Sequence, residues 1–280
     1  MTTRLAWKSL SAALVSLVVM GPFAGRAQAA SPFKDKNLEA AVRAVLQHEP
    51  NVELTDEKLM NVYVLEAPGK EIKDLTGLEK CKNIELLKLT KNQVADLAPL
   101  KELTNLQSLD LAENQIKDIA PLTALTKLQY LELSGNKVID LKPLAGLTAL
   151  ASLYLTNNQI EDLGPIAGLT KLASLSLGQN KVKNLAPLAK VTRLNVLDLK
   201  GNQVEDVGPL SAQTDLKILI IQENQIKDLS ALVKAAKADS DGPKRFAPYL
   251  RLYLAGNPLS DDAKKAQLDA LKAAGVRVEG

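Results

Sequence analysis

The chain has 280 residues, of which 24% are charged, with a formal net charge of +3 and a single cysteine, Cys81. One cysteine excludes an internal disulfide framework. The first 29 residues hold three basic side chains and no acidic ones, so the remainder is formally neutral, which excludes a general electrostatic attraction for nucleic acid or an anionic membrane.

Residues 1–29 have the pattern of a secretory signal peptide. Arg4 and Lys8 precede an apolar run at residues 10–20, and the small-residue pattern AQA at residues 27–29 predicts cleavage after Ala29. The run is about half the length of a membrane-spanning helix, so we expect no stable membrane insertion after cleavage, and an uncleaved anchor is the alternative. Export places the mature protein in the periplasm or outside the cell, and the sequence does not separate the two.

Residues 30–60 are predicted to form a helical N-terminal cap. An apolar stripe at helical spacing runs through Leu38, Val42, Val45 and Leu46. Asp35 and Thr55 stand where N-cap residues are expected. His48, the only histidine, falls in the intervening loop and is expected to be an exposed loop residue.

Residues 61–259 contain an internal repeat. Asparagine recurs every 22 residues at seven positions, and once more after a 33-residue step: Asn92, Asn114, Asn136, Asn158, Asn180, Asn202, Asn224 and Asn257. Before each asparagine, leucines alternate as in a short strand. After it, apolar residues follow every third position, as in a 3₁₀-like turn. Stacking such units gives one continuous leucine core, so the sequence predicts an α/β solenoid.

The C-terminal part departs from this period. The 33-residue step holds an insertion at residues 236–248, which is predicted to be a polar loop. Such a loop either contacts a ligand or is sequence variation without a function that the fold tolerates. Residues 260–280 are predicted to be a helical C-terminal cap, because Ser260 suits the N-cap, Gly275 suits the end, and Leu268 and Leu271 lie on one face. Such caps cover the open ends of a repeat array.

The 22-residue pattern, with strings such as NQIKDIAPL and NQIEDLGPI, resembles the bacterial internalin-like leucine-rich repeat family. The resemblance runs from about residue 32 to 260 and includes the N-terminal helical cap. It implies a curved solenoid with a parallel sheet on its concave side, 3₁₀ turns on its convex side, and protein ligands bound on the concave side. The chain differs from internalins after residue 260, where it has a helical cap in place of an immunoglobulin-like region.

The repeated polar residues are read as structural. An asparagine amide can both donate to and accept from backbone groups of a turn, so the asparagine ladder needs no chemical role. The carboxylates that open each D-L-x-P segment can cap backbone N–H groups, and Asn184 in the fifth of these positions keeps the bond without the charge. Cys81 occupies a leucine position and is expected to be buried. We therefore expect no catalytic, metal or cofactor-binding residues.

The outward-facing strand positions are the ones free to vary. Tyrosine is favoured at protein interfaces, and adjacent strands lie about 4.8 Å apart, which brings residues from successive repeats together. The candidate partner-binding residues are Asp110, Tyr130, Glu132, Tyr154, Asp198, Ile218, Ile220 and Tyr253.

The function predicted from sequence is that of an exported, non-enzymatic interaction module that binds a protein partner on the concave face as a monomer. Two alternatives stay open: a self-associating structural protein of the cell envelope, and a glycan-binding module.

Overall fold

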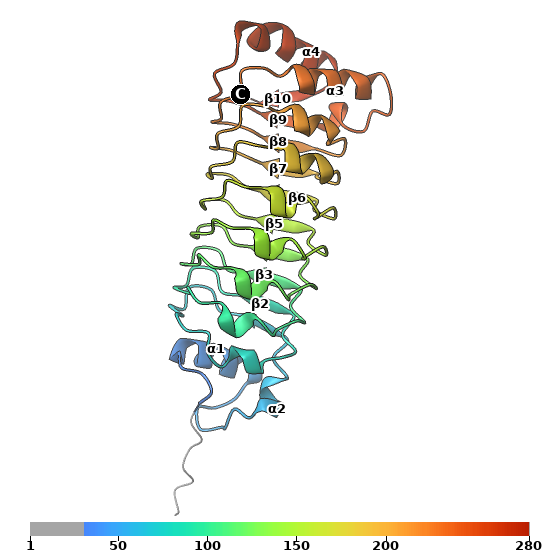
Figure 1. Ribbon diagram of the computed structural model, residues 1–280. Helices are drawn as coiled ribbons and strands as arrows, with labels where there is room; N and C mark the ends of the chain where they lie inside the picture. Colours follow the sequence, from blue (N-terminus) through green and yellow to red (C-terminus); the bar gives the residue numbers. More distant parts are fainter. Residues whose placement is uncertain (1–30, 280) are drawn as a thin grey trace, which may run out of the picture. The chain divides into compact units, whose positions relative to one another are not determined.

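The structure, a computed structural model, describes residues 31–279, so the signal-peptide prediction lies outside the described residues. Within that range ten short strands form one parallel sheet whose order follows the sequence (Figure 1). The strands are β1 (Val64–Glu66), β2 (Leu86–Lys88), β3 (Ser108–Asp110), β4 (Tyr130–Glu132), β5 (Ser152–Tyr154), β6 (Ser174–Ser176), β7 (Val196–Asp198), β8 (Ile218–Ile220), β9 (Arg251–Tyr253) and β10 (Arg277–Glu279). The predicted fold class is confirmed.

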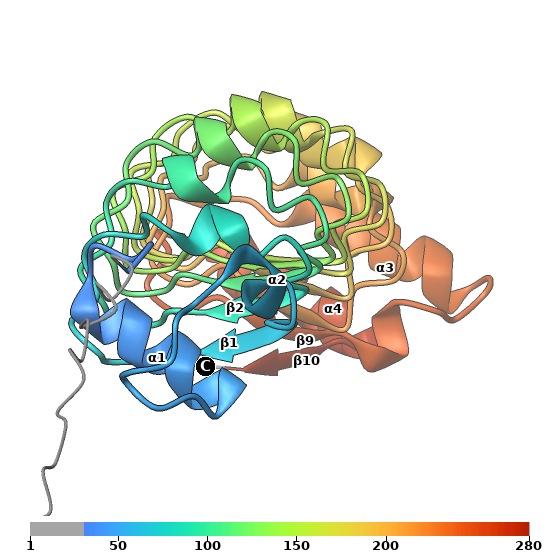
Figure 2. The same cartoon turned by 90° about the horizontal axis from the view of Figure 1, so that it is seen from below.

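Each repeat is one turn of a coil. Its strand leads to a residue with left-handed φ just before the asparagine, such as Glu113 at 53° or Gly135 at 70°, and the chain then runs to the side opposite the sheet (Figure 2). There it forms a short 3₁₀ helix with proline near its start, which presets φ. These helices are η1 (Leu78–Lys80), η2 (Ala98–Leu100), η3 (Ala120–Leu122), η4 (Lys142–Leu144), η5 (Gly164–Ile166), η6 (Ala186–Lys190) and η7 (Gly208–Ala212), with proline in all but η1.

The core lies between the strands and the 3₁₀ helices. The middle residue of each strand is buried, as Leu109 and Leu131 are, and the leucines of the turns meet them from the other side. Because every repeat presents the same set, the core continues through the array. Cys81 is fully buried in it, at a position that leucine fills in later repeats.

The N-terminal cap is tied to the first repeat by one carboxylate. Helices α1 (Lys36–Leu46) and α2 (Asp56–Leu59) precede the sheet, and α1 packs beside β1. One Asp35 oxygen accepts from the Leu38 amide at 3.1 Å, while the other accepts from the Lys73 amide at 2.8 Å. Asp35 therefore both begins α1 and fixes it to the array. Val45, expected in the apolar stripe, is 40% exposed.

The C-terminal end differs from the expectation in two ways. The insertion is not a polar loop throughout, because α3 (Ser230–Ser240) extends into it and η8 (Ala247–Tyr249) ends it. The segment that begins α3 lacks the proline of the other repeats and is rich in alanine, which favours an α-helix. The final helix contains a π-helical turn (Ala263–Gln267) before α4 (Leu268–Ala273), and the chain then adds β10 to the sheet. None of the helices in residues 31–279 is long and apolar enough to cross a bilayer.

Candidate binding surface

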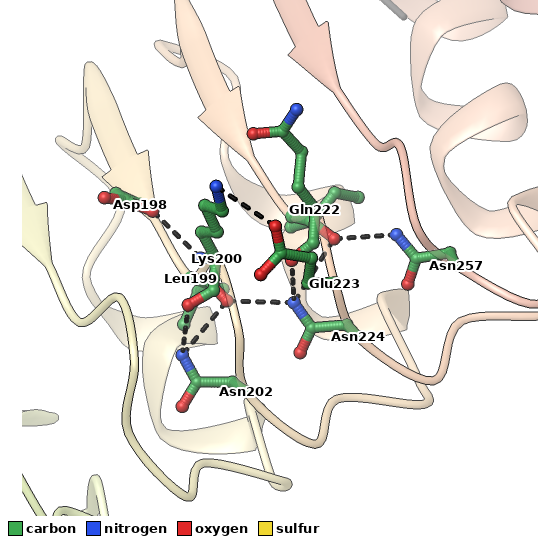
Figure 3. Close-up of polar contacts among 9 residues, drawn as sticks. Asp198, Leu199, Lys200, Asn202, Gln222, Glu223, Asn224 and Asn257 are labelled. Carbon is green, nitrogen blue, oxygen red and sulfur yellow. Dashed lines mark hydrogen bonds and ion pairs between the residues drawn. The ribbon is translucent and has the colours of Figure 1, made fainter. Parts of the chain in front are cut away.

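The asparagine ladder is a continuous hydrogen-bond network. The Asn114 amide donates to the Leu111 carbonyl of its own turn at 3.0 Å and to the Leu89 carbonyl of the preceding repeat at 2.9 Å, while its oxygen accepts from the Val94 amide at 2.9 Å. The same arrangement recurs to the end of the array, where Asn257 joins it (Figure 3). Each repeat is thereby joined to its neighbour, and these amides serve the frame.

The aspartates before the 3₁₀ helices cap the backbone. Asp118 accepts from the Ala120 amide at 2.8 Å, and Asn184 accepts from the Ala186 amide at 2.9 Å. Asparagine therefore makes the same bond without charge, as the sequence comparison of the repeats predicts. The carboxylates lie one per repeat along the array, and each is bonded to its own turn.

The outward residues of the strands form two straight columns on the sheet face. Strand pairing is in register, so Ser108 lies opposite Tyr130, and Asp110 lies opposite Glu132. In each strand from β2 to β8 the middle residue is buried and the outer two are partly exposed. The candidate partner-binding residues all belong to these columns, within strands β3, β4, β5, β7, β8 and β9.

The columns extend further than the candidate residues chosen from the sequence. Val64 and Glu66 of β1 precede Leu86 and Lys88 in register, and Arg277 and Glu279 of β10 follow β9. The first pair could have been found from the degenerate repeat, because its asparagine position is residue 70 and the same offsets lead to residues 64 and 66. The second pair carries no repeat signal.

Aromatic and acidic residues meet in the N-terminal half of the face. The rings of Tyr130 and Tyr154 lie with centroids 5.5 Å apart and planes tilted by 46°. Burial raises the pKa of the Glu132 carboxyl above its usual value, and the nearby Asp110 carboxylate adds to the rise. Burial also raises the pKa of the Tyr130 hydroxyl to about 12, with further contributions from Glu132 and Asp110. Negative charge is thus concentrated beside two partly buried tyrosines.

A hollow of about 200 Å³ adjoins these residues. Its lining includes Glu66, Lys88, Asp110 and Tyr130, together with small and apolar residues of β2 and β3. In the described part of the chain, none of these charged groups forms an ion pair. The hollow therefore offers two carboxylates and one ammonium group to a ligand.

The C-terminal half of the face is more apolar. Ile218 lies opposite Val196 on the neighbouring strand, and Ile220 lies opposite Asp198. Asp198 is already bonded, because one of its oxygens accepts from the Lys200 amide at 2.9 Å and the other from the Ser176 hydroxyl at 3.2 Å. The last two strands, β9 and β10, carry charged and aromatic residues. The Arg251 guanidinium lies 5.5 Å from the ring centroid of Tyr253 and also pairs with Glu279.

Histidine and cysteine, which are common in catalytic and metal sites, occur once each in the chain. His48 is half-buried in the loop after α1. Within residues 31–279, histidine, cysteine and carboxylate side chains do not gather in threes close enough to hold a metal ion. The sheet face carries varied side chains at regular positions, an arrangement that suits recognition by contact.

These features define a leucine-rich repeat solenoid. Residues 104–146 and 148–190 match the family model described as leucine rich repeats (2 copies). Among curated protein sequences, none matches the chain significantly.

Comparison with solved structures shows which type of leucine-rich repeat protein the chain is similar to. Internalin C2 from Listeria monocytogenes is 31% identical with a TM-score of 0.71, and the match covers 82% of this chain and 97% of that one. The functional domain of InlJ from the same species is 23% identical with a TM-score of 0.63, over 84% of this chain and 54% of that one. A third similar structure is the leucine-rich repeat ectodomain of the plant receptor kinase GASSHO1/SCHENGEN3 from Arabidopsis thaliana, solved with Casparian strip integrity factor 2. It is 21% identical with a TM-score of 0.59, and the match covers 73% of this chain and 25% of that one. The chain belongs to the internalin-type leucine-rich repeat family.

Proposed function

We propose that the protein is exported and binds a partner protein on the exposed face of its sheet. Leucine-rich repeat proteins of the internalin type are interaction modules. The observation that carries the proposal is the difference between two sets of residues in the repeats. The recurring asparagines, and the aspartates before the 3₁₀ helices, bond to backbone groups. The strand columns hold tyrosines and isoleucines whose side chains take no part in that network, beside carboxylates such as Asp110 and Glu132 that each accept from one backbone amide.

The Tyr130–Tyr154 pair is the proposed centre of this interface. Partly buried tyrosines give large contact areas at little cost in side-chain entropy and are frequent binding hot spots. Asp110 and Glu132 flank the pair, and Ile218, Ile220 and Tyr253 extend the surface towards the C-terminal end, with Asp198 between the two halves. A partner that spans both halves would contact acidic, aromatic and apolar areas in turn.

The acidic half further implies a basic segment on the partner. The Glu132 carboxylate is partly desolvated and lies near Asp110, an arrangement that is unfavourable in isolation. An arginine or lysine side chain entering the hollow beside Glu66 and Asp110 would relieve that repulsion and could contact the Tyr130 ring. Association should then slow as the salt concentration rises.

We propose binding without catalysis. The aspartates that could suggest acid–base chemistry are each bonded to a backbone amide of their own turn, and one is replaced by Asn184. These groups lie one per repeat, so they do not provide the pair of facing carboxylates that acid–base hydrolysis of a glycosidic bond uses.

Affinity capture tests the proposal. The chain from residue 30 onwards is immobilised and exposed to cell-envelope and host-surface extracts, beside Tyr130→Ala/Tyr154→Ala and an Ile139→Ala control. Ile139 is 47% exposed and lies outside the strands. We expect one or more proteins captured by the parent and by the control but lost with the double variant. Equal capture by all three, also after Ile218→Ala/Ile220→Ala, would contradict a binding site on the sheet face.

Two measurements address the remaining parts of the proposal. Sedimentation of the purified chain distinguishes a monomer that binds a partner from a self-associating envelope protein, which would assemble alone. Mass spectrometry of the protein recovered after expression of the full chain tests export, because cleavage after Ala29 gives a mature chain that begins at residue 30. A chain retained at full length inside the cell would contradict export.

A further inference from the structure

The insertion after the eighth strand is held in one conformation by a buried carboxylate. Asp239, near the end of α3, is 5% exposed. Its side chain accepts from three successive backbone amides, those of Arg245 at 3.0 Å, Phe246 at 2.9 Å and Ala247 at 2.8 Å. Burial alone raises the pKa of this carboxyl, but the three amides outweigh that effect and hold the pKa below its usual value. The segment is thus organised around a charged side chain. A loop whose sequence merely varies without a function would not need such a network.

Two buried residues also anchor this segment to the hydrophobic core. Phe246 is 2% exposed and Ala247 is fully buried, so both are part of the core. The Lys244 amide donates to the Asp239 carbonyl at 2.9 Å, and Lys244 itself adopts a left-handed φ of 53°. The side chains of Lys244 and Arg245 therefore start from fixed backbone positions while their ends lie in solvent.

This segment forms one wall of a cavity of about 410 Å³. The other wall comes from the turns that lead into β7 and β8. The lining consists of Asn195, Asp215, Lys217, Lys244, Arg245 and Tyr249. None of them lies within a sheet strand, so the cavity shares no residue with the two columns of the proposed protein-binding face, which begin directly after Asn195 and Lys217 in β7 and β8.

The cavity carries an excess of positive charge. Arg245 pairs with Asp215 across it. Lys217 and Lys244 take part in no ion pair within residues 31–279. Two ammonium groups are therefore available to an anion. Beside them lies the Asn195 side-chain amide, whose nitrogen uses one hydrogen in a bond to the Arg193 carbonyl at 3.1 Å. Lysine is a common phosphate and carboxylate ligand that acts as a point charge.

The aromatic member adds a second kind of contact. Tyr249 is 60% exposed, the largest exposed fraction among the large apolar and aromatic residues of the described chain. A tyrosine ring with an open face gives an apolar surface and a polar tip at the same place. A cavity of this volume is in the range of small-molecule sites.

We propose that this cavity is a second binding site, which takes a sugar carrying a phosphate or carboxylate group. The anion lies between Lys217 and Lys244, the Asn195 amide bonds a hydroxyl group, and the sugar ring lies against Tyr249. Arg245 is held in place by Asp215 and shapes the cavity wall. The site does not depend on the proposed protein interface, because it shares no residue with it.

Ligand titration followed by NMR tests this proposal on the chain from residue 30 onwards. The probes are glucose 6-phosphate and glucuronate, with glucose and inorganic phosphate as references. The test variant is Lys217→Ala/Lys244→Ala, and Tyr249→Ala is measured beside it. The matched control is Lys181→Ala/Lys183→Ala, which removes the same charge from two exposed lysines of the fifth 22-residue step. Melting curves of all variants establish that the fold is kept.

We expect at least one acidic sugar to bind with a dissociation constant in the millimolar range, and both test variants to weaken it by about tenfold or more while the control does not. Binding of only glucose 6-phosphate identifies a phosphosugar, and binding of only glucuronate identifies a uronate. The proposal is overturned if neither acidic sugar binds, if glucose or inorganic phosphate binds equally well, or if the test variants bind as the parent does.

Discussion

Replacing Asn158 with alanine tests whether the asparagine ladder stabilises the array. The Asn158 amide donates to the Leu133 and Leu155 carbonyls, both at 3.0 Å, and its oxygen accepts from the Val138 amide at 2.9 Å. The two carbonyls keep a second donor from the neighbouring asparagines, Asn136 and Asn180. The Val138 amide has no other partner among the hydrogen bonds of the described chain and is left buried without one.

The expected cost follows from these contacts. An orphaned buried amide costs about 1–3 kcal/mol, and each further lost hydrogen bond costs about 0.5–1.5 kcal/mol. We therefore expect Asn158→Ala to lower the free energy of unfolding by about 3 kcal/mol. Asn184→Ala is the matched control, because it makes the same substitution at an exposed cap with a single bond to the Ala186 amide, for which we expect a cost of about 1 kcal/mol.

Urea denaturation followed by circular dichroism measures both variants. Repeat arrays can unfold in parts, so the comparison uses the midpoint and slope of each curve, with hydrogen exchange at the Val138 amide as a local readout. Equal costs for the two variants would refute the reasoning, since the ladder would then matter no more than an exposed cap.

Three further predictions concern buried or partly buried groups. Burial raises the pKa of the Cys81 thiol to about 12, so we expect no reaction with a thiol reagent at pH 8 until denaturant is added; rapid labelling of the folded protein would contradict its burial. The pKa of Glu132 is raised in the folded state, so its ionised form disfavours folding above that pKa and the effect disappears as the pH falls through it. Glu132→Gln should therefore raise the melting temperature slightly at pH 7 and leave it unchanged near pH 3, and a lower value at pH 7 would show that the carboxylate is stabilising. Asp239→Ala leaves the buried Phe246 and Ala247 amides without a partner, which we expect to cost about 2–4 kcal/mol and to increase hydrogen exchange across residues 241–249; unchanged exchange there would show that the carboxylate does not hold the segment.

The repeat frame could be predicted from the sequence because its signals are local and repeated. A fixed 22-residue step places the asparagines from Asn92 to Asn224 in the same environment, so one interpretation applies to all of them. Alternation around Leu109 indicates the strand, and a proline shortly after the aspartate, as Pro121 follows Asp118, indicates the start of a 3₁₀ helix.

The C-terminal region could not be predicted in the same way. The insertion depends on Asp239, whose role requires three amides six to eight residues later in the chain to converge on it. Strand β10 has no alternating pattern long enough to be recognised, and it forms because β9 leaves an open edge beside it. The cavity at Lys217 and Lys244 unites residues from separate repeats with the insertion, and no spacing in the sequence indicates that they meet.

The candidate residues on the sheet face lie between these two cases. Their column positions follow from the period, so the proximity of Tyr130 and Tyr154 could be anticipated. Their electrostatics could not, because the raised pKa of Glu132 depends on how far neighbouring side chains bury it. The repeat frame fixes where these side chains lie, whereas the contribution of each one to the binding free energy depends on its own contacts with the partner.

The affinity of the captured partner protein for the Tyr130→Ala/Tyr154→Ala variant tests the central claim most directly. Isothermal titration calorimetry on the parent, the double variant and Ile139→Ala gives three dissociation constants under the same conditions. If the sheet face is the binding site, the double variant binds at least about tenfold more weakly, a loss of about 1.4 kcal/mol or more, while Ile139→Ala matches the parent and all three melt at similar temperatures. Dissociation constants within about twofold of one another would place the interface elsewhere on the molecule.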